Sequence, residues 1–143
     1  MENQAQGKEF TVTLPAKWLD RSMLVWSAPA SSNDPTPPNV IVARDYLPED
    51  MTLNQYVNEQ VKRLLNHEEN ADVEQHSQIE WHGKPAVELV VLNLHKDFHT
   101  KQRQIYVMPE KGQLLQVSFT AKASEYHNYQ TVFDEIEQSF SWK

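Results

Sequence analysis

The sequence predicts a single α+β domain in which two main helices pack on a mostly antiparallel sheet of about six to seven strands. The chain has 143 residues, which suits one domain with one core. Its strand-like and helix-like segments follow in the order three strands, one helix, four strands, one helix. Because strands succeed one another without a helix between each pair, an antiparallel sheet is favoured over a Rossmann-type fold. No internal repeat or second domain is found, so we expect residues 1–143 to form one domain, with residues 1–8 flexible.

The first strands are predicted from alternation and from apolar runs. Residues 10–14 alternate apolar and polar side chains, which is typical of a strand with one buried face, and Pro15 ends the segment. Residues 22–27 carry apolar side chains on both faces. Residues 28–38 contain four prolines and are predicted to form a loop. Residues 39–45 form the third predicted strand.

Two helices are predicted from capping residues and from apolar spacing. Thr52 and Gln55 have the form of a capping box, in which each side chain bonds the backbone N–H of the other residue. The apolar stripe that follows runs to about Asn66 and contains Leu53, Tyr56, Val57, Val61 and Leu64. Ser124 is predicted to cap the last helix. The apolar stripe of that helix contains Tyr126, Tyr129, Val132, Phe133, Ile136 and Phe140.

A weakly alternating strand follows the first helix. It covers residues 73–81 and is expected to place Val73, Ile79 and Trp81 on one side. Residues 82–83, a His-Gly pair, then turn the chain.

The remaining strands are predicted to form a meander. Residues 85–94 form a long strand whose two faces are both largely apolar, and residues 95–100 form a polar turn. Residues 102–108 and 113–121 are expected to pair as a hairpin around residues 109–112.

The composition excludes several classes of protein. The net charge of −7 argues against nucleic acid and against an anionic membrane surface, because both require a clustered basic face. The absence of cysteine excludes disulfides, thiolate chemistry and zinc–cysteine sites. The longest apolar run, residues 86–94, is far shorter than the roughly 18–20 residues of a membrane span. The polar start lacks the apolar segment of a signal peptide, which favours a soluble, cytoplasmic protein, although a chain whose leader had been removed would look the same.

Phosphate-binding and acid–base chemistry are not predicted. The three glycines, at positions 7, 83 and 112, cannot build a Gly-rich phosphate loop, and no G-x-S-x-G nucleophile motif occurs. Asp134 and Glu135 are adjacent on a helix, so their side chains diverge and a solvated surface is favoured over a paired acid and base.

The spacing of His95 and His99 is a candidate metal motif. An H-x-x-x-H pair shares one face only on a helix, whereas these residues fall in a predicted polar turn with no evident third ligand. We therefore expect no catalytic residue, no metal and no cofactor.

Two features raise the possibility of a binding surface. Gln60 lies within the apolar stripe of the first helix, where a buried amide without a hydrogen bond costs about 1–3 kcal/mol. Its amide either bonds nearby backbone or lies at the edge of the core, or it faces a groove that receives a partner. The apolar run at residues 22–27 is open to two explanations: helices cover both faces of the sheet, or one face stays open because a partner docks there. Since two helices are few for about seven strands, we expect an uncovered part of the sheet to bind a partner.

Short runs along most of the chain together resemble one family. They are residues 14–18 (LPAKW), 20–22 (DRS), 40–45 (VIVARD), 56–60 (YVNEQ), 83–86 (GKPA) and 103–107 (RQIYV). In this order and spacing they resemble the DcrB-like family with a PsbP-like fold, and within it the Eag chaperones of bacterial type VI secretion systems. The resemblance spans about residues 10–140 and implies a curved sheet.

The resemblance also implies a function and a set of binding residues. Eag chaperones bind the hydrophobic N-terminal transmembrane segments of secreted effectors, next to the PAAR domain of the effector. They shield those segments in the cytoplasm until the effector is loaded on the secretion spike, and they act as homodimers whose curved sheets form a groove. The implied apolar contacts are Met23, Val25 and Ile41, and the implied polar contacts are Gln60 and Gln104. Met23 departs from the branched aliphatic residues of relatives, although a flexible thioether suits an adaptable apolar surface.

Three functional hypotheses are therefore open. The first is an effector chaperone that has no catalytic residue, binds no nucleic acid and does not itself insert into the membrane. The second is a non-catalytic PsbP-like accessory or structural domain that docks on a membrane-associated complex, which predicts a signal peptide or lipobox at the native start. The third is an unrecognised enzyme, whose turnover would be abolished by a single His or Asp substitution.

Overall fold

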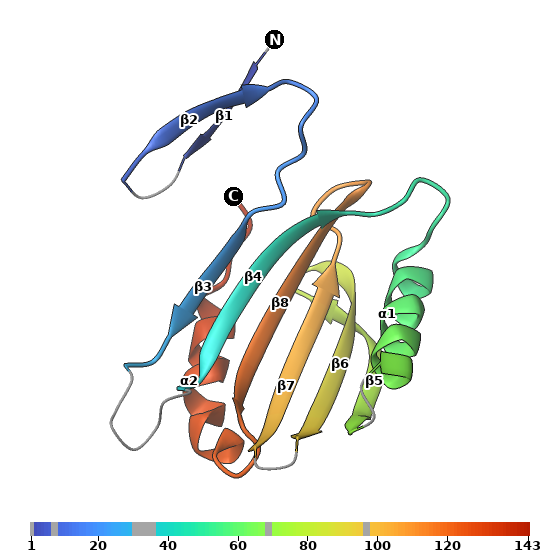
Figure 1. Cartoon of the computed structure of the whole chain (residues 1–143), viewed down its shortest axis with the longest axis vertical. Coiled ribbons are helices and arrows are strands. Elements are labelled where there is room, and N and C mark those ends of the chain that lie inside the picture. The colour runs from blue at the N-terminus through green and yellow to red at the C-terminus, as the bar shows by residue number, and fades with distance from the viewer. Residues whose placement is uncertain (1, 7–8, 30–36, 68–69, 96–97) are drawn as a thin grey trace.

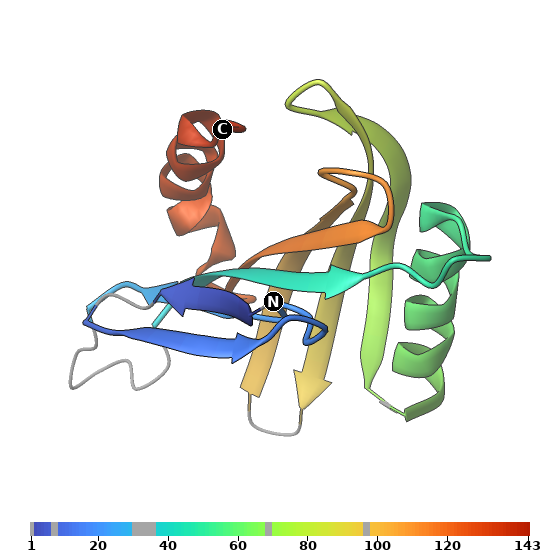
Figure 2. The same cartoon turned by 90° about the horizontal axis from the view of Figure 1, so that it is seen from above.

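The fold was obtained as a computed structural model and matches the predicted α+β class (Figure 1). The structure describes residues 2–6, 9–29, 37–67, 70–95 and 98–143. Its main sheet has six strands, in the spatial order β3-β4-β8-β7-β6-β5, and every neighbouring pair is antiparallel. The strands are β3 (Met23–Ser27), β4 (Asn39–Tyr46), β5 (Ala71–Trp81), β6 (Lys84–His95), β7 (Phe98–Val107) and β8 (Gln113–Lys122). The sheet is visibly curved, as the family resemblance implies (Figure 2).

Two further strands form a separate hairpin at the N-terminus. Strand β1 (Glu2–Gln6) pairs antiparallel with β2 (Thr11–Pro15), and this pair lies beyond the end of the main sheet (Figure 1). The segment that the sequence analysis expected to be flexible thus includes a strand, and residues 1, 7 and 8 lie outside the described residues. Most of the predicted loop at 28–38 also lies outside them, because residues 30–36 are not described.

One helix packs on each face of the sheet (Figure 2). Helix α1 (Leu53–His67) covers one face, where Leu53 and Val57 pack against apolar residues of β6 and β7. Helix α2 (Tyr126–Ser139) covers the other face, where Tyr126 and Phe133 pack against residues of β4, β7 and β8. We call these the α1 face and the α2 face. No helix in the described part of the chain is long and apolar enough to cross a membrane.

The capping box of α1 is confirmed by its hydrogen bonds. The Thr52 N–H donates to Gln55 Oε1 at 2.9 Å, and the Gln55 N–H donates to Thr52 Oγ1 at 3.2 Å. These two bonds satisfy donors that the first helical turn leaves without intrahelical partners, and so they fix where α1 begins.

The predicted start of α2 is wrong by one residue. The N-cap is Glu125, and no side chain caps this helix end. The Glu125 N–H donates to the Lys122 carbonyl, and the Asn128 N–H donates to the Glu125 carbonyl, so the turn that leaves β8 already runs into the helix. Ser124 therefore lies too early in the chain to act as the cap.

The predicted apolar stripe of α2 is only partly buried. Tyr126 and Phe133 are buried, but Val132 and Ile136 remain exposed. The C-terminal half of α2 is separated from β3 and β4 by a cavity that Ile136 lines, so Ile136 does not pack against these two strands.

Strand β5 departs from the prediction because it contains a β-bulge. The pairing register with β6 shifts between Val73 and Gln75. An extra residue reverses the alternation of side chains along a strand. As a result Val73 packs in the cluster under α1, whereas Ile79 and Trp81 pack in the cluster under α2. The expectation that all three share one side is wrong for this reason.

The turns of the meander are partly as expected. The turn at His82 and Gly83 is confirmed, and both residues adopt positive φ angles, of 48° and 81°. Such angles suit a two-residue hairpin turn and favour glycine at the second position. The polar turn expected at 95–100 is shorter, because β6 continues to His95 and β7 starts at Phe98. His95 and His99 thus belong to two paired strands, opposite Phe98 and Leu94 respectively.

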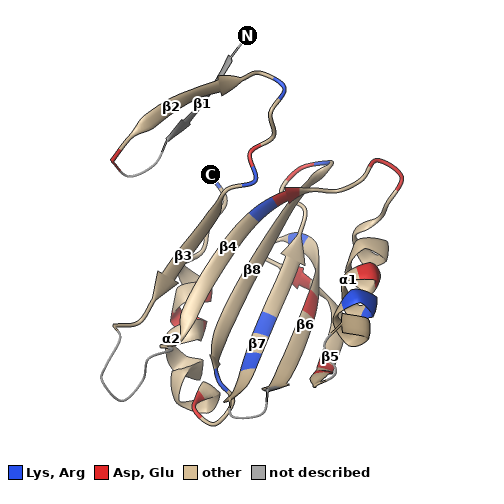
Figure 3. Cartoon of the chain, viewed as in Figure 1, with Lys and Arg blue, Asp and Glu red and all other residues tan. Residues whose placement is uncertain are grey.

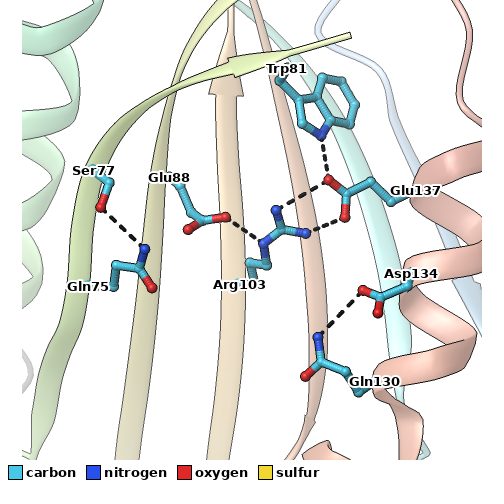
Figure 4. Close-up of polar contacts among 8 residues, drawn as sticks. All are labelled: Gln75, Ser77, Trp81, Glu88, Arg103, Gln130, Asp134 and Glu137. Carbon is cyan, nitrogen blue, oxygen red and sulfur yellow. Dashed lines mark hydrogen bonds and ion pairs between the residues drawn. The ribbon is translucent and has the colours of Figure 1, made fainter.

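Helix α2 is tied to the sheet by a cluster of charged side chains (Figure 4). Arg103 of β7 donates through Nε to Glu88 Oε2 at 2.6 Å and pairs through both terminal nitrogens with the Glu137 carboxylate of α2. The indole N–H of Trp81 donates to the same carboxylate at 2.9 Å. Burial opposes ionisation of Glu137, but the hydrogen bonds from Arg103 and Trp81 outweigh it and hold the pKa of Glu137 below its usual value.

We predict that Glu137→Gln lowers the free energy of unfolding by about 2 kcal/mol at neutral pH, because it leaves the Arg103 guanidinium without its main partner. The lowered pKa of Glu137 means that its contribution is complete above the usual value of 4.5 and is lost as the pH falls through the folded-state value. Denaturant unfolding between pH 7 and pH 3 measures this: the difference in stability between the two proteins should be constant above pH 4.5 and should shrink as the pH falls below it. The exposed neighbour Glu135 provides the control, since Glu135→Gln should have little effect. A constant difference at all pH values would contradict the assignment.

Candidate functional site

Three of the five predicted binding residues lie in one row across the sheet. The pairing register places Val25 of β3 opposite Ile41 of β4, Ile41 opposite Ser118 of β8, and Ser118 opposite Gln104 of β7. Because directly paired residues of antiparallel strands project to the same face, these four side chains form a continuous band. Met23 pairs with Ala43 and begins the next row on that face.

The band lies on the α1 face of the sheet. Side chains alternate along each strand, and the neighbours Ile105 and Tyr106 pack in the clusters under α2 and α1 respectively. Gln104 is two residues from Tyr106 and therefore points to the α1 face. By the same alternation Val40 packs in the cluster under α2, which places Ile41 on the α1 face.

The β3 end of this face is uncovered. Helix α1 packs against residues of β5, β6, β7 and β8, and Met23 and Val25 at the sheet edge are exposed. Of the two explanations for the apolar run at 22–27, cover by helices on both faces is correct only in part, and docking of a partner on an open face stays a prediction. Helices do lie on both faces, but α1 lies away from β3 (Figure 1), and a cavity separates β3 from α2 on the other face. The α1 face of β3, β4 and β8 forms an open surface beside α1.

Gln104 is the centre of a chain of hydrogen bonds on this surface. The Tyr106 hydroxyl donates to Gln104 Oε1 at 2.7 Å, Gln104 Nε2 donates to Gln102 Oε1, and Gln102 Nε2 donates to Thr120 Oγ1 at 2.8 Å. Burial and the neighbouring Tyr56 raise the pKa of Tyr106, which keeps its hydroxyl protonated and able to donate. Gln104 therefore has a structural role in addition to any role in binding.

Gln60 is placed differently from Gln104. It lies on α1, is half-buried, and makes no side-chain hydrogen bond to any residue that the structure describes. The first alternative for Gln60, a core amide bonded to nearby backbone, is not observed among the described residues. Gln60 lies at the edge of the core with its amide available, on the helix that borders the open surface.

Sequence reasoning missed several polar residues of the open surface. Ser118 is buried within the row, and Gln102, Thr120 and Asn39 line up beside it through the pairs Gln102–Thr120 and Asn39–Thr120. The Asn39 Oδ1 atom is buried and has no hydrogen-bond partner among the described residues. The signal was present as polar residues at alternate positions of β7 and β8. In β8 these polar residues lie between apolar residues that face α2.

Charged side chains are almost absent from the open surface (Figure 3). Strand β3 has none, and β4 has only Arg44 and Asp45, which lie at its C-terminal end. No group of three or more His, Cys, Asp or Glu side chains suited to a metal ion occurs in the described ranges. The surface thus combines an apolar part on β3 and β4, formed by Met23, Val25 and Ile41, with amides and hydroxyls on β7 and β8. It can pack against apolar groups and also form hydrogen bonds with uncharged polar groups.

The fold and the sequence place the chain in a known class. Three solved structures share the fold over nearly the whole chain. One is PA94 from Pseudomonas aeruginosa, described as a protein of unknown function and putative regulator, with 18% identity, a TM-score of 0.80 and coverage of 99% of this chain and 97% of that chain. LpqN from Mycobacterium tuberculosis, described as involved in cell envelope biogenesis, has 16% identity, a TM-score of 0.60 and coverage of 97% and 88%. The cyanobacterial PsbP from Synechocystis has 13% identity, a TM-score of 0.55 and coverage of 99% and 92%.

These structures define the architecture as a PsbP-like fold. Residues 9–139 match the DcrB family, and the chain belongs to that family. No curated protein matches the chain in sequence.

We predict that Gln104→Leu lowers the free energy of unfolding by about 1–2 kcal/mol, because the Tyr106 hydroxyl, in a side chain that is only 4% exposed, loses its acceptor. In the double variant Gln104→Leu/Tyr106→Phe the cost should be smaller than the sum of the single costs, as measured by a double-mutant cycle in denaturant. Gln60→Leu is the control and should leave stability nearly unchanged. Additive costs would contradict the proposed bond.

Proposed function

We propose that this chain is a chaperone for apolar helices of a type VI secretion effector. It binds the hydrophobic N-terminal transmembrane segments of the effector, next to the PAAR domain, and shields them in the cytoplasm until the effector is loaded on the secretion spike. The observation that carries this proposal is the open α1 face, where Val25, Ile41 and Gln104 share one row, and Gln60 lies half-buried on the helix of that face. Homodimers of the chain would enlarge this surface.

The chemistry of the open surface suits a transmembrane helix in water. Such a helix exposes apolar area that costs about 25 cal/mol per Å², and its backbone is already hydrogen-bonded internally. A partner therefore needs an apolar surface and a few groups that can pair with occasional polar side chains of the helix. Met23, Val25 and Ile41 provide the first, and Gln60 and Gln104 provide the second. The lack of charge on β3 avoids the desolvation cost that a buried ion would add.

We predict that Val25→Asp abolishes the holding of client helices without unfolding the chain, because Val25 is 56% exposed. A carboxylate would be desolvated against the apolar client, so recovery of the complex should fall by about tenfold or more. The measurement is co-expression with a soluble reporter fused to the hydrophobic N-terminal region of a PAAR-containing effector encoded beside this gene. The readouts are the soluble fraction of the reporter and its co-purification with the chain.

Val132→Asp is a matched control for this experiment. Val132 is 48% exposed and lies on α2, on the opposite face of the sheet, so the same change there should leave client recovery as in the wild type. A reporter that stays soluble without the chain, or equal losses in the two variants, would refute the proposed function.

A second function, from a different class, is supported by the fold alone. The likeness to a cyanobacterial PsbP and to LpqN suits an accessory or structural domain that docks on a membrane-associated complex. This alternative requires export, so it predicts a signal peptide or lipobox at the native start of translation. Mapping of the N-terminus of the protein in its own cells separates the two functions.

A further inference from the structure

The N-terminal hairpin has apolar residues but no core of its own. We use the term arm for β1, residues 9–10, β2 and residues 16–19. Phe10, Val12, Trp18 and Leu19 are between 41% and 64% exposed, and none of them belongs to either core cluster. An isolated two-stranded hairpin is marginally stable at best in water, and a group of exposed apolar side chains usually marks an interaction site. The arm therefore needs a surface to pack on.

Residues 20–22, which link the arm to β3, direct the arm away from the sheet of its own chain. The Ser22 N–H donates to Asp20 Oδ1 at 2.9 Å, and Asp20 pairs with Arg44 at 3.8 Å. Arg21 pairs with Asp45 at 3.4 Å. These contacts hold residues 20–22 against the end of β4, and the arm lies beyond that end of the sheet rather than over a face of β3 (Figure 1). To cover its own β3, the arm would have to reverse direction within residues 16–19.

A complementary apolar surface lies on the α2 face of β3. A cavity of about 560 Å³ separates β3 and β4 from the C-terminal half of α2. Its walls include Leu24, Trp26, Val42, Trp81, Phe140 and Trp142. Leu24 and Trp26 are 47% and 57% exposed, and β3 is also an edge strand with an unpaired side. Exposed edges of this kind are normally covered in native proteins.

We propose that the arm of a second copy of this chain fills the cavity on the α2 face of β3, in a reciprocal exchange between two copies. The cavity is within the size range of pockets that enclose a drug-sized ligand, so it has room for large side chains such as Phe10 or Trp18. A two-fold exchange closes on itself, because each copy supplies one arm and one cavity. The exchange covers Leu24 and Trp26 and leaves Met23 and Val25 on the opposite face.

This inference goes beyond the chaperone proposal, since it names the segment that joins two copies and the surface that receives it. It also assigns separate roles to the two faces of one strand. The α1 face of β3 is left to a client, and the α2 face is taken by the partner arm.

Cross-linking between copies tests the exchange cleanly, because the chain contains no native cysteine. Two differently tagged chains, one with Val12→Cys and one with Trp26→Cys, are co-expressed and treated with a short bismaleimide. We expect a covalent dimer that carries both tags. The matched control replaces Trp26→Cys with Val25→Cys, which lies next to it on the opposite face of β3 and should cross-link at least fivefold less.

Three outcomes would overturn the inference. These are no mixed dimer, equal cross-linking at Val25→Cys and Trp26→Cys, or a cross-link that forms only within a single chain carrying both Val12→Cys and Trp26→Cys. The last outcome would mean that each arm covers its own cavity.

Sedimentation velocity provides an independent measurement. The wild type should sediment near twice the 16.7 kDa chain mass, and Trp26→Asp should sediment as a monomer, since it places a charge in the cavity at an exposed position that the monomer fold does not need. Val25→Asp should remain dimeric. A wild type that is monomeric yet still holds client helices would refute the exchange alone, whereas a dimer that holds no client would refute only the chaperone function.

Discussion

The architecture depends on the small area of sheet that the two helices cover: only one helix packs on each face of the six-stranded sheet. Helix α1 packs towards β5, β6 and β7, and α2 packs towards β8 with the help of the Glu137–Arg103 pair. Strand β3 at the far edge is not packed by α1, and a cavity separates it from α2, so its side chains are exposed on both faces. Both proposed interactions involve this one strand, because each of its faces has exposed apolar side chains that no described helix of the chain packs on.

The polar residues of the open surface differ in how far they belong to the fold. Gln104 accepts from the buried Tyr106 hydroxyl and donates to Gln102, so its amide is held in one orientation. A partner group that approaches Gln104 meets an amide that is already oriented, which lowers the entropic cost of binding. Gln60 is half-buried and makes no side-chain hydrogen bond within the described residues, so in the proposed complex its amide could turn to suit the client. One amide is therefore preorganised and the other is adaptable.

The sequence predicted most elements but not where alternation breaks. Capping chemistry located α1 through Thr52, because that signal is local. The bulge near Val73 depends on how β5 pairs with β6, and no local sequence pattern indicates it. The sequence therefore predicted Val73 on the wrong face of the sheet. For the candidate site, the sequence did show that Gln60 is a polar residue within the apolar stripe of the first helix. It did not single out Ser118, because a serine in a strand is ordinary until the register sets it between Ile41 and Gln104. The family resemblance, rather than periodicity, supplied the predicted binding residues.

The bulge in β5 also affects how the domain unfolds. Because one strand supplies Val73 to the cluster under α1 and Ile79 and Trp81 to the cluster under α2, neither cluster is complete without it. Detachment of β5 from β6 would open both cores together. Strands β6, β7 and β8 also supply both clusters, through ordinary alternation of their side chains. The two helices, although on opposite faces, are thus thermodynamically coupled through the sheet, and we expect the domain to unfold in one cooperative step rather than face by face.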